Sequence, residues 1–356
     1  MQANQNEETN MLPIFNASMR IEVEKEFDFI NRKYELNLCI NSILAGDKSI
    51  LIGERGVGKS ALVKQIQFEL ENNYDNVLPI YIQFSPINFS HSTHIGYVYH
   101  LLLSVINYIW TNILGYKMSS LYDDELTLKN EFTEQVKKIH KLIRLVTQNT
   151  KILNQKGIEA DFFAKGNLQK AKEYFENLSP LSNQEMIALF GELCDDLRKY
   201  TEVNNLVFLC DEANLLTETE QIEIARELSN IFPMLSCSFL YVASIFSVDG
   251  YCSLHTDFFE QTILIEGFKN IEHSIALLQN RILQKDRVTI DDQVYELLHR
   301  TTRGNPRDLI GIMNQIIRNK TINDVDQITI TPQDAQKACN HFDKQKLQNQ
   351  KFYNKI

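Results

Sequence analysis

An eight-residue run that begins at Gly53 constrains the fold of this 356-residue chain more than any other feature. It reads Gly-Glu-Arg-Gly-Val-Gly-Lys-Ser, follows an apolar run at residues 50–52, and precedes a helix-like segment. Glycines let a loop wrap closely around phosphate groups, while successive backbone N–H groups and the N-terminus of the next helix attract the anion. The pattern therefore predicts a strand, a phosphate-binding loop and a helix, in that order.

The side chains of this run also have chemical uses. Lys59 is expected to reach the β and γ phosphates of a nucleoside triphosphate, and Ser60 is expected to be a ligand of Mg²⁺. ATP and Mg²⁺ are therefore the predicted cofactors. The predicted nucleotide contacts in the loop are Gly53, Glu54, Arg55, Gly56, Val57, Gly58, Lys59, Ser60 and Ala61.

A second motif supports this interpretation. The apolar run at residues 206–210 is followed directly by Asp211 and Glu212, which is a Walker B pattern. We expect Asp211 to hold the Mg²⁺ shell and Glu212 to polarise a water toward the γ phosphate, as a catalytic base. An apolar run before two acidic residues is common by itself, but together with the phosphate-binding loop it predicts a site that can hydrolyse ATP.

Short apolar runs alternate with longer amphipathic segments, which is the pattern of a parallel α/β sheet. The five predicted strands are residues 49–52, 78–84, 206–210, 239–243 and 262–265. Roughly 120 residues separate the second strand from the third, far more than an ordinary crossover, so we predict a helical insertion at about 115–180. From about residue 270 onward, helical spacing replaces the strand signals.

The segment just upstream of the loop carries a family resemblance. Residues 29–36 read Phe-Ile-Asn-Arg-Lys-Tyr-Glu-Leu and resemble the F-[VI]-[GN]-R-x-x-E-L box of AAA+ P-loop ATPases, in the initiator (origin-recognition) and STAND/archaeal-ATPase groups. In those families the box borders the adenine, so the resemblance implies adenine contacts for Phe29, Ile30 and Arg32. The alternative interpretation of the box is the first turn of an amphipathic helix.

Two further positions match the family pattern. Ser244 follows the fourth predicted strand, where the family carries the polar sensor 1 residue, and Ser247 is a nearby competitor. Residues 304–307, Gly-Asn-Pro-Arg, resemble the sensor 2 element. Asn305 suits a helix N-cap and the following proline suits the first helical position, which places Arg307 in the first turn. The resemblance implies that Arg307 reaches the γ phosphate, and the alternative is a surface charge.

One departure from the family concerns the arginine finger, which normally lies between sensor 1 and the fifth strand. Residues 245–268 contain no arginine or lysine, and His255 is the one candidate cation there. Because an arginine finger accelerates hydrolysis by orders of magnitude, we expect slow turnover, a finger from elsewhere such as Arg226, or one donated by a partner.

The resemblance implies a three-layer αβα P-loop core with a parallel five-stranded sheet, followed by an all-helical lid. We assign residues 1–26 to an N-terminal arm, 27–268 to the nucleotide-binding core with its insertion, 269–343 to the lid, and 344–356 to a basic tail. The implied function is a regulatory ATPase switch in which ATP closes the lid on the core. We expect it to act as a homo-oligomer or as part of a multi-subunit complex.

Charge and composition bear on the alternatives. The net charge of −10 disfavours non-specific attraction to DNA or to an anionic membrane, although a DNA-loading ATPase and a nucleotide-holding scaffold stay open as alternatives. The apolar stretch at residues 97–114 carries polar residues and lacks basic flanks, so we interpret it as a buried helix. The six cysteines form no C-x-x-C pair and no secretory signal is evident, which fits a reduced cytoplasm.

Overall fold

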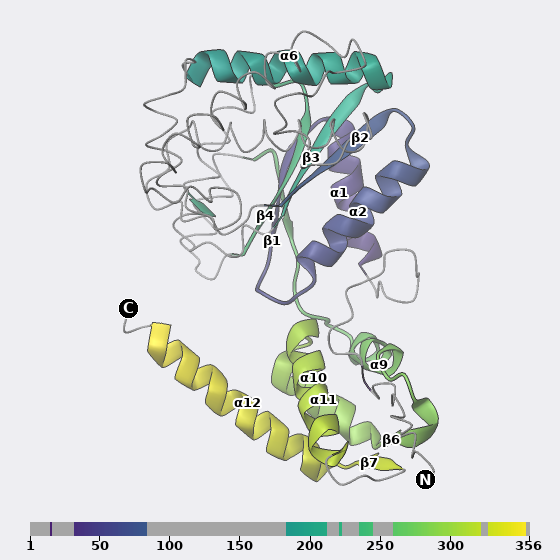
Figure 1. Cartoon of the computed structure of the whole chain (residues 1–356). Coiled ribbons are helices and arrows are strands. Elements are labelled where there is room, and N and C mark those ends of the chain that lie inside the picture. The colour runs from purple at the N-terminus through teal and green to yellow at the C-terminus, as the bar shows by residue number, and fades with distance from the viewer. Residues whose placement is uncertain are drawn as a thin grey trace, which may run out of the picture. The chain divides into compact units, whose positions relative to one another are not determined.

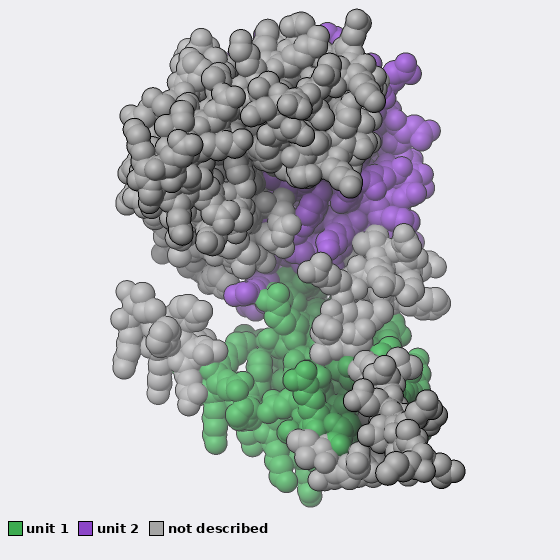
Figure 2. Space-filling view, in the orientation of Figure 1, with its two compact units in different colours: residues 1–32, 56–58, 266–356 green, residues 33–55, 59–265 purple. Residues whose placement is uncertain are grey.

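The computed structural model describes residue 15 and residues 32–83, 183–211, 221–222, 235–244, 259–321 and 327–353. The chain divides into two compact units, which Figure 2 shows in different colours. The sheet unit comprises residues 33–55 and 59–265, and the helical unit comprises residues 1–32, 56–58 and 266–356. Three residues of the glycine-rich loop, 56–58, thus belong to the helical unit.

The sheet unit is built on five parallel strands. They are β1 (Lys48–Ile52), β2 (Val77–Gln83), β3 (Asn205–Asp211), β4 (Ser238–Ala243) and β5 (Gln261–Leu264). Their order across the sheet is β2-β3-β4-β1-β5, and all four neighbouring pairs are parallel. The strand β1 is therefore flanked by two strands, β4 and β5, that come about two hundred residues later in the chain. The parallel five-stranded sheet expected from the sequence is confirmed.

Helices cover both faces of this sheet. Side chains alternate between the two faces along a strand, so Asn205 and Asp211 of β3 share one face and Phe208 lies on the other. On the first face, Asn205 donates to the carbonyl oxygen of Ile43 in α1 (Lys33–Ala45) at 3.1 Å. On the second face, the Phe208 ring contacts Phe190 of α6 (Asn183–Thr201), with ring centroids 5.6 Å apart. The core therefore has three layers, as expected.

The helix α2 (Lys59–Asn73) lies on the same face as α1. It follows the glycine-rich loop directly, and Figure 1 shows it running alongside the strands of the sheet. Its buried residues Leu62, Val63, Ile66 and Leu70 recur at helical spacing and contact the sheet. Packing of this apolar face fixes the helix N-terminus, and with it Lys59 and Ser60, at the end of β1.

The described residues of the helical unit form four α-helices and a short 3₁₀ helix, η5 (Lys285–Arg287). The α-helices are α9 (Ile271–Asn280), α10 (Asp292–Thr302), α11 (Pro306–Thr321) and α12 (Pro332–Tyr353). Their buried core includes Leu278, Leu298, Leu309 and Met313, none of which is exposed to solvent. Polar side chains cap the N-termini of these helices. Asn270 accepts from the second residue of α9, Asp291 does the same for α10, and Asn305 does so for α11. Thr331 and Asp334 accept from each other's backbone N–H groups at the start of α12.

The helical unit differs from the expected lid in two respects. It is not entirely helical, because β6 (Val288–Ile290) and β7 (Ile328–Ile330) pair in parallel. Each of these strands is a β-branched triplet with a central threonine, which favours extended structure but is too short to stand out in the sequence. The expected tail at residues 344–356 also begins inside a helix, because α12 continues without a break to Tyr353.

Several expectations fall on residues outside the described ranges. These are the helical insertion at about 115–180, the apolar stretch at 97–114, and all of the N-terminal arm except Phe15. Phe15 itself is buried in the core of the helical unit and forms an antiparallel bridge with Ile282. None of the helices in the described part of the chain combines the length and the apolar character needed to cross a membrane.

Candidate functional site

The glycine-rich loop runs from the end of β1 at Ile52 to the start of α2 at Lys59. Gly56 and Gly58 have φ angles of +95° and +102°, a backbone conformation that residues other than glycine rarely adopt. A Cβ atom added at Gly58 would meet no atom within 4 Å, so the loop leaves open space at that position. The backbone conformation and this space fit a loop that a phosphate group can approach closely.

The Lys59 side chain folds back into the loop. It is buried, with 4% of its surface exposed, and its Nζ atom donates to the carbonyl oxygens of Gly53 and Glu54 at 2.7 and 2.8 Å. These two carbonyl groups hold the ammonium group beside the N-terminus of α2, where the helix dipole also favours an anion. The predicted lysine is therefore placed where a phosphate oxygen could accept from it.

Asp211, at the end of β3, lies next to the loop. The hydroxyl group of Ser60 donates to Oδ1 of Asp211 at 3.1 Å, and the hydroxyl group of Tyr81 on β2 donates to Oδ2 at 2.8 Å. Asp211 is completely buried. The structure thus brings together the serine and the aspartate that the sequence predicts as Mg²⁺ ligands, although 151 residues separate them in the chain.

Ser244 directly follows β4, the strand between β3 and β1. The register pairs Ala243 with Ile52, so Ser244 lies beside the first residue of the loop at the same edge of the sheet. Ser244 is completely buried, and its backbone N–H donates to Oε1 of Gln221 at 2.7 Å. Within the described part of the chain its hydroxyl oxygen has no hydrogen-bond partner. A buried hydroxyl group at this edge is suited to bind a water molecule or a phosphate oxygen.

Arg32 contacts three residues of the helical unit, Val57, Glu266 and Phe268. Its guanidinium group donates to the carbonyl oxygens of Val57, at 3.3 Å, and of Glu266, and it lies over the Phe268 ring at 5.1 Å from the centroid. Only 8% of Arg32 is exposed. The sequence predicts that Arg32 contacts adenine, which stays a prediction. In this structure Arg32 fixes the backbone of the loop at Val57.

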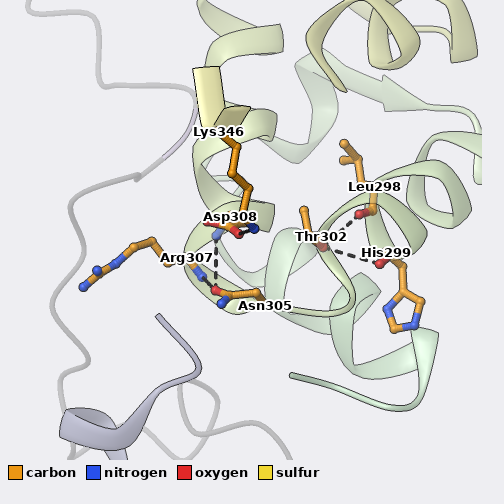
Figure 3. A network of polar contacts seen from close by, with 7 residues as sticks. All are labelled: Leu298, His299, Thr302, Asn305, Arg307, Asp308 and Lys346. Carbon is orange, nitrogen blue, oxygen red and sulfur yellow. Dashed lines mark hydrogen bonds and ion pairs between the residues drawn. The ribbon is translucent and has the colours of Figure 1, made fainter. Parts of the chain in front are cut away.

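Arg307 lies in the first turn of α11, as predicted. Oδ1 of Asn305 accepts from the backbone N–H of Arg307 at 3.1 Å, so Asn305 caps this helix, and Pro306 is its first residue. The same N–H group also donates to the carbonyl oxygen of Gly56 at 3.3 Å. Figure 3 shows the Arg307 side chain pointing away from Asn305 and Asp308, while Lys346 of α12 reaches Asp308 at 3.5 Å.

Some of the remaining predicted residues lie within the described ranges and others lie outside them. Glu54 and Arg55 are exposed at the tip of the loop, Val57 is buried, and Ala61 lies in the first turn of α2. Phe29, Ile30 and Glu212 lie outside the described residues, so their predicted contacts with adenine and with the attacking water stay predictions. The same holds for Ser247, Arg226 and His255.

The residues present fit a nucleotide with its metal ion. Mg²⁺ prefers oxygen ligands and is commonly held by one or two protein groups together with phosphate oxygens. The paired oxygens of Ser60 and Asp211 provide such ligands, and the buried ammonium group of Lys59 and the N-terminus of α2 provide positive charge for the phosphates. Cys210 directly precedes Asp211. Burial, the larger cause, and the negative charge of Asp211, the smaller one, raise the pKa of the Cys210 thiol, so this thiol stays protonated.

Sequence reasoning missed two residues at this site, Tyr81 and Gln221. Tyr81 carried a weak signal, because a polar-tipped side chain within a strand covered on both faces needs a hydrogen-bond partner. Gln221 carried no signal in the sequence, since its contact with Ser244 joins residues 23 positions apart that share no local pattern.

No protein-family model and no curated protein sequence matches the chain. Among solved structures, the Orc1 protein of Aeropyrum pernix in complex with DNA is similar, with 12% identity and a TM-score of 0.45 over 88% of this chain. A variant of RuvB from Thermotoga maritima is similar with 14% identity and a TM-score of 0.36, again over 88% of this chain. The chain spans 66% of the Orc1 protein and 70% of that RuvB chain. Function is therefore inferred from the site itself.

Proposed function

We propose that this chain is an AAA+ ATPase that binds ATP with Mg²⁺, hydrolyses it slowly, and acts as a regulatory switch inside a larger complex. One observation carries the proposal. The Ser60 hydroxyl group donates to the Asp211 carboxylate at 3.1 Å, beside a loop that holds the buried Lys59 ammonium group. A serine and a lysine at the end of a glycine-rich loop, with an aspartate beside them at the end of β3, have few uses other than binding a phosphate–metal complex.

Bound ATP and Mg²⁺ would supply a reactive phosphoanhydride bond and a Lewis acid. The residues of the chain would do the rest. Lys59 would neutralise charge on the β and γ phosphates, and the loop N–H groups would orient them. Asp211 would hold the metal shell. We assign the polarisation of water to Glu212, and the placement of that water to the buried hydroxyl group of Ser244.

A switch is favoured by how the loop is held within the helical unit. Arg32 donates to the carbonyl oxygen of Val57, and the first turn of α11 donates to that of Gly56. A phosphate that changes the conformation of residues 56–58 would therefore change the contacts of α11 as well. Such local events commonly bias a larger conformational equilibrium, which is how nucleotide-dependent switches work.

The first experiment measures binding of a fluorescent ATP analogue to the purified chain in the presence of Mg²⁺. Lys59→Ala should lower the affinity by about 10-fold to 100-fold, because a hydrogen bond from a charged group contributes about 1.5–3 kcal/mol. Lys64→Ala is the matched control. Lys64 lies five residues after Lys59 in α2, and its substitution removes the same charge. Equal affinities for the two variants would refute the proposed nucleotide site.

The second experiment measures ATP turnover by the wild type and by Glu212→Gln. The variant should bind ATP normally and lose turnover, and normal turnover would refute the role of Glu212 as the base.

Adding duplex DNA at low and moderate salt tests the alternative, since salt-sensitive stimulation of turnover would indicate a DNA-loading ATPase. Sedimentation with and without ATP tests for the proposed homo-oligomer, and failure of wild-type turnover with normal binding would indicate a nucleotide-holding scaffold.

A further inference from the structure

Tyr81 reaches the candidate metal site from a strand that carries neither nucleotide-binding motif. It lies on β2, where the register pairs it with Leu209 of β3, two residues before Asp211. Alternation along the strands places Tyr81, Leu209 and Asp211 on the same face of the sheet, the face that α2 covers. The hydroxyl group of Tyr81 then donates diagonally across the two strands to Oδ2 of Asp211 at 2.8 Å.

The Asp211 carboxylate is thereby held by a hydroxyl group on each oxygen. Ser60 donates to Oδ1 from α2, and Tyr81 donates to Oδ2 from β2. Two donors on opposite sides of a carboxylate fix its rotation about χ2, which is otherwise a broad torsion. The Ser60 oxygen keeps lone pairs that could bind a metal ion while its O–H group still donates to Oδ1 of Asp211. The orientation of this pair therefore depends on the donor at Oδ2.

We propose that Tyr81 is a positioning residue that sets the Mg²⁺ affinity of the nucleotide site by orienting Asp211. This inference rests on the proposed function and names a residue that neither sequence motif contains. Partners that orient a metal-binding carboxylate typically change metal affinity by 10-fold to 100-fold when they are removed. A purely structural tyrosine would instead affect the stability of the sheet and leave the metal response unchanged.

The test compares Tyr81→Phe with the wild type, because this substitution removes the hydroxyl group and keeps the ring. The dissociation constant of a fluorescent ATP analogue is measured in EDTA and in saturating Mg²⁺, and the ratio of the two constants reports the metal contribution. We expect Tyr81→Phe to leave the constant in EDTA unchanged and to reduce the ratio about tenfold. Ser60→Ala serves as a reference that removes the donor on the other oxygen.

Tyr74→Phe is the matched control, since Tyr74 lies in the same unit, between α2 and β2, and loses the same hydroxyl group. It should keep the wild-type ratio. The urea midpoint of each variant without nucleotide shows whether the variant is folded. If Tyr81→Phe is folded and keeps the wild-type ratio, the positioning role is overturned.

The two proposals fail in different ways. Nucleotide binding that depends on Lys59 but shows no Mg²⁺ effect in the wild type would overturn the role of Tyr81 and leave ATP binding in place. Absence of nucleotide binding in the wild type would overturn the proposed function, and the inference about Tyr81 with it. A reduced ratio in Tyr81→Phe, together with a normal ratio in Tyr74→Phe, would support both.

Discussion

The segment that carries Arg307 depends on a close backbone contact between Gly304 and Phe268. The N–H of Phe268 donates to the carbonyl oxygen of Gly304 at 2.8 Å, and Gly304 has a φ angle of +69°. A Cβ atom at Gly304 would collide with the carbonyl oxygen and the nitrogen of Phe268. Because these are backbone atoms, they cannot rotate away. We predict that Gly304→Ala is strongly destabilising.

Substitutions at three other glycines separate the effect of the positive φ angle from the effect of the collision. Gly46 has a φ angle of +88° with no atom within 4 Å of an added Cβ, so Gly46→Ala tests backbone strain alone. Gly267 lacks a positive φ angle, but its Cβ would collide with the carbonyl oxygen of Arg303, so Gly267→Ala tests the collision alone. Gly311 in α11 has neither problem, and Gly311→Ala should stabilise.

The magnitudes follow from these contacts. Left-handed backbone costs an L residue about 1–2 kcal/mol, and the reduced freedom of the unfolded chain returns about 0.4–1 kcal/mol, so Gly46→Ala should cost about 1 kcal/mol. Overpacking costs about 1–3 kcal/mol, which is expected for Gly267→Ala. Gly304→Ala combines both effects and should cost about 3 kcal/mol or more. Gly311→Ala should gain roughly 0.5–1 kcal/mol.

The assay is urea unfolding followed by far-ultraviolet circular dichroism, with all four variants measured without nucleotide. The order of midpoints should be Gly311→Ala, wild type, Gly46→Ala, Gly267→Ala and Gly304→Ala, from most to least stable. A cost for Gly304→Ala no greater than that for Gly46→Ala would refute the close contact with Phe268. Destabilisation by Gly311→Ala would show that α11 packs more tightly there than the structure indicates.

Two further predictions concern polar contacts of the helical unit. Arg32→Lys should destabilise this unit by about 2–3 kcal/mol in urea. Lysine cannot reproduce a planar guanidinium group whose Nη2 atom bonds two carbonyl groups while the group lies over the Phe268 ring. Arg318→Lys at an exposed position should have no such effect. Burial raises the pKa of Asp334, but hydrogen bonds from Lys320 and Thr331 outweigh it and lower the pKa below its ordinary 3.8. A lowered pKa stabilises the folded chain above the unfolded-state value, and this contribution is lost as pH falls through the folded-state value. Asp334→Asn should therefore destabilise by about 1 kcal/mol at pH 7, and the difference between its urea midpoint and that of the wild type should shrink as the pH falls below 3.8.

The sheet was predictable because its strands are buried on both faces. Strands of this kind read as continuous apolar runs, and each predicted range agrees with the structure to within one or two residues, as for β3 at Asn205–Asp211. The start of α11 was predictable for a different reason. Asn305 and Pro306 have strong positional preferences at a helix N-terminus, and both act locally.

Contacts that depend on strand order could not be predicted in the same way. The sequence does not show that β2 neighbours β3, so the bond from Tyr81 to Asp211 was not foreseen. The contacts of Arg32 with Val57 and Glu266 join segments 25 and 234 residues away, and no local pattern encodes them. The paired strands β6 and β7 were missed because three residues are too few to show a period.

The position of β1 within the sheet has a consequence for synthesis of the chain. Its two neighbours are β4 and β5, which begin at Ser238 and Gln261. A nascent chain that ends after β3 therefore contains both strands of the β2–β3 pair, while β1 still lacks both of its neighbours. Until β4 has been synthesised, the backbone N–H and C=O groups of β1 have no partner strand in the sheet. An apolar strand with unpaired backbone groups tends to pair with other chains. The glycine-rich loop that follows β1 would therefore become ordered late. Premature termination before Ser238 should give fragments that aggregate and do not bind nucleotide.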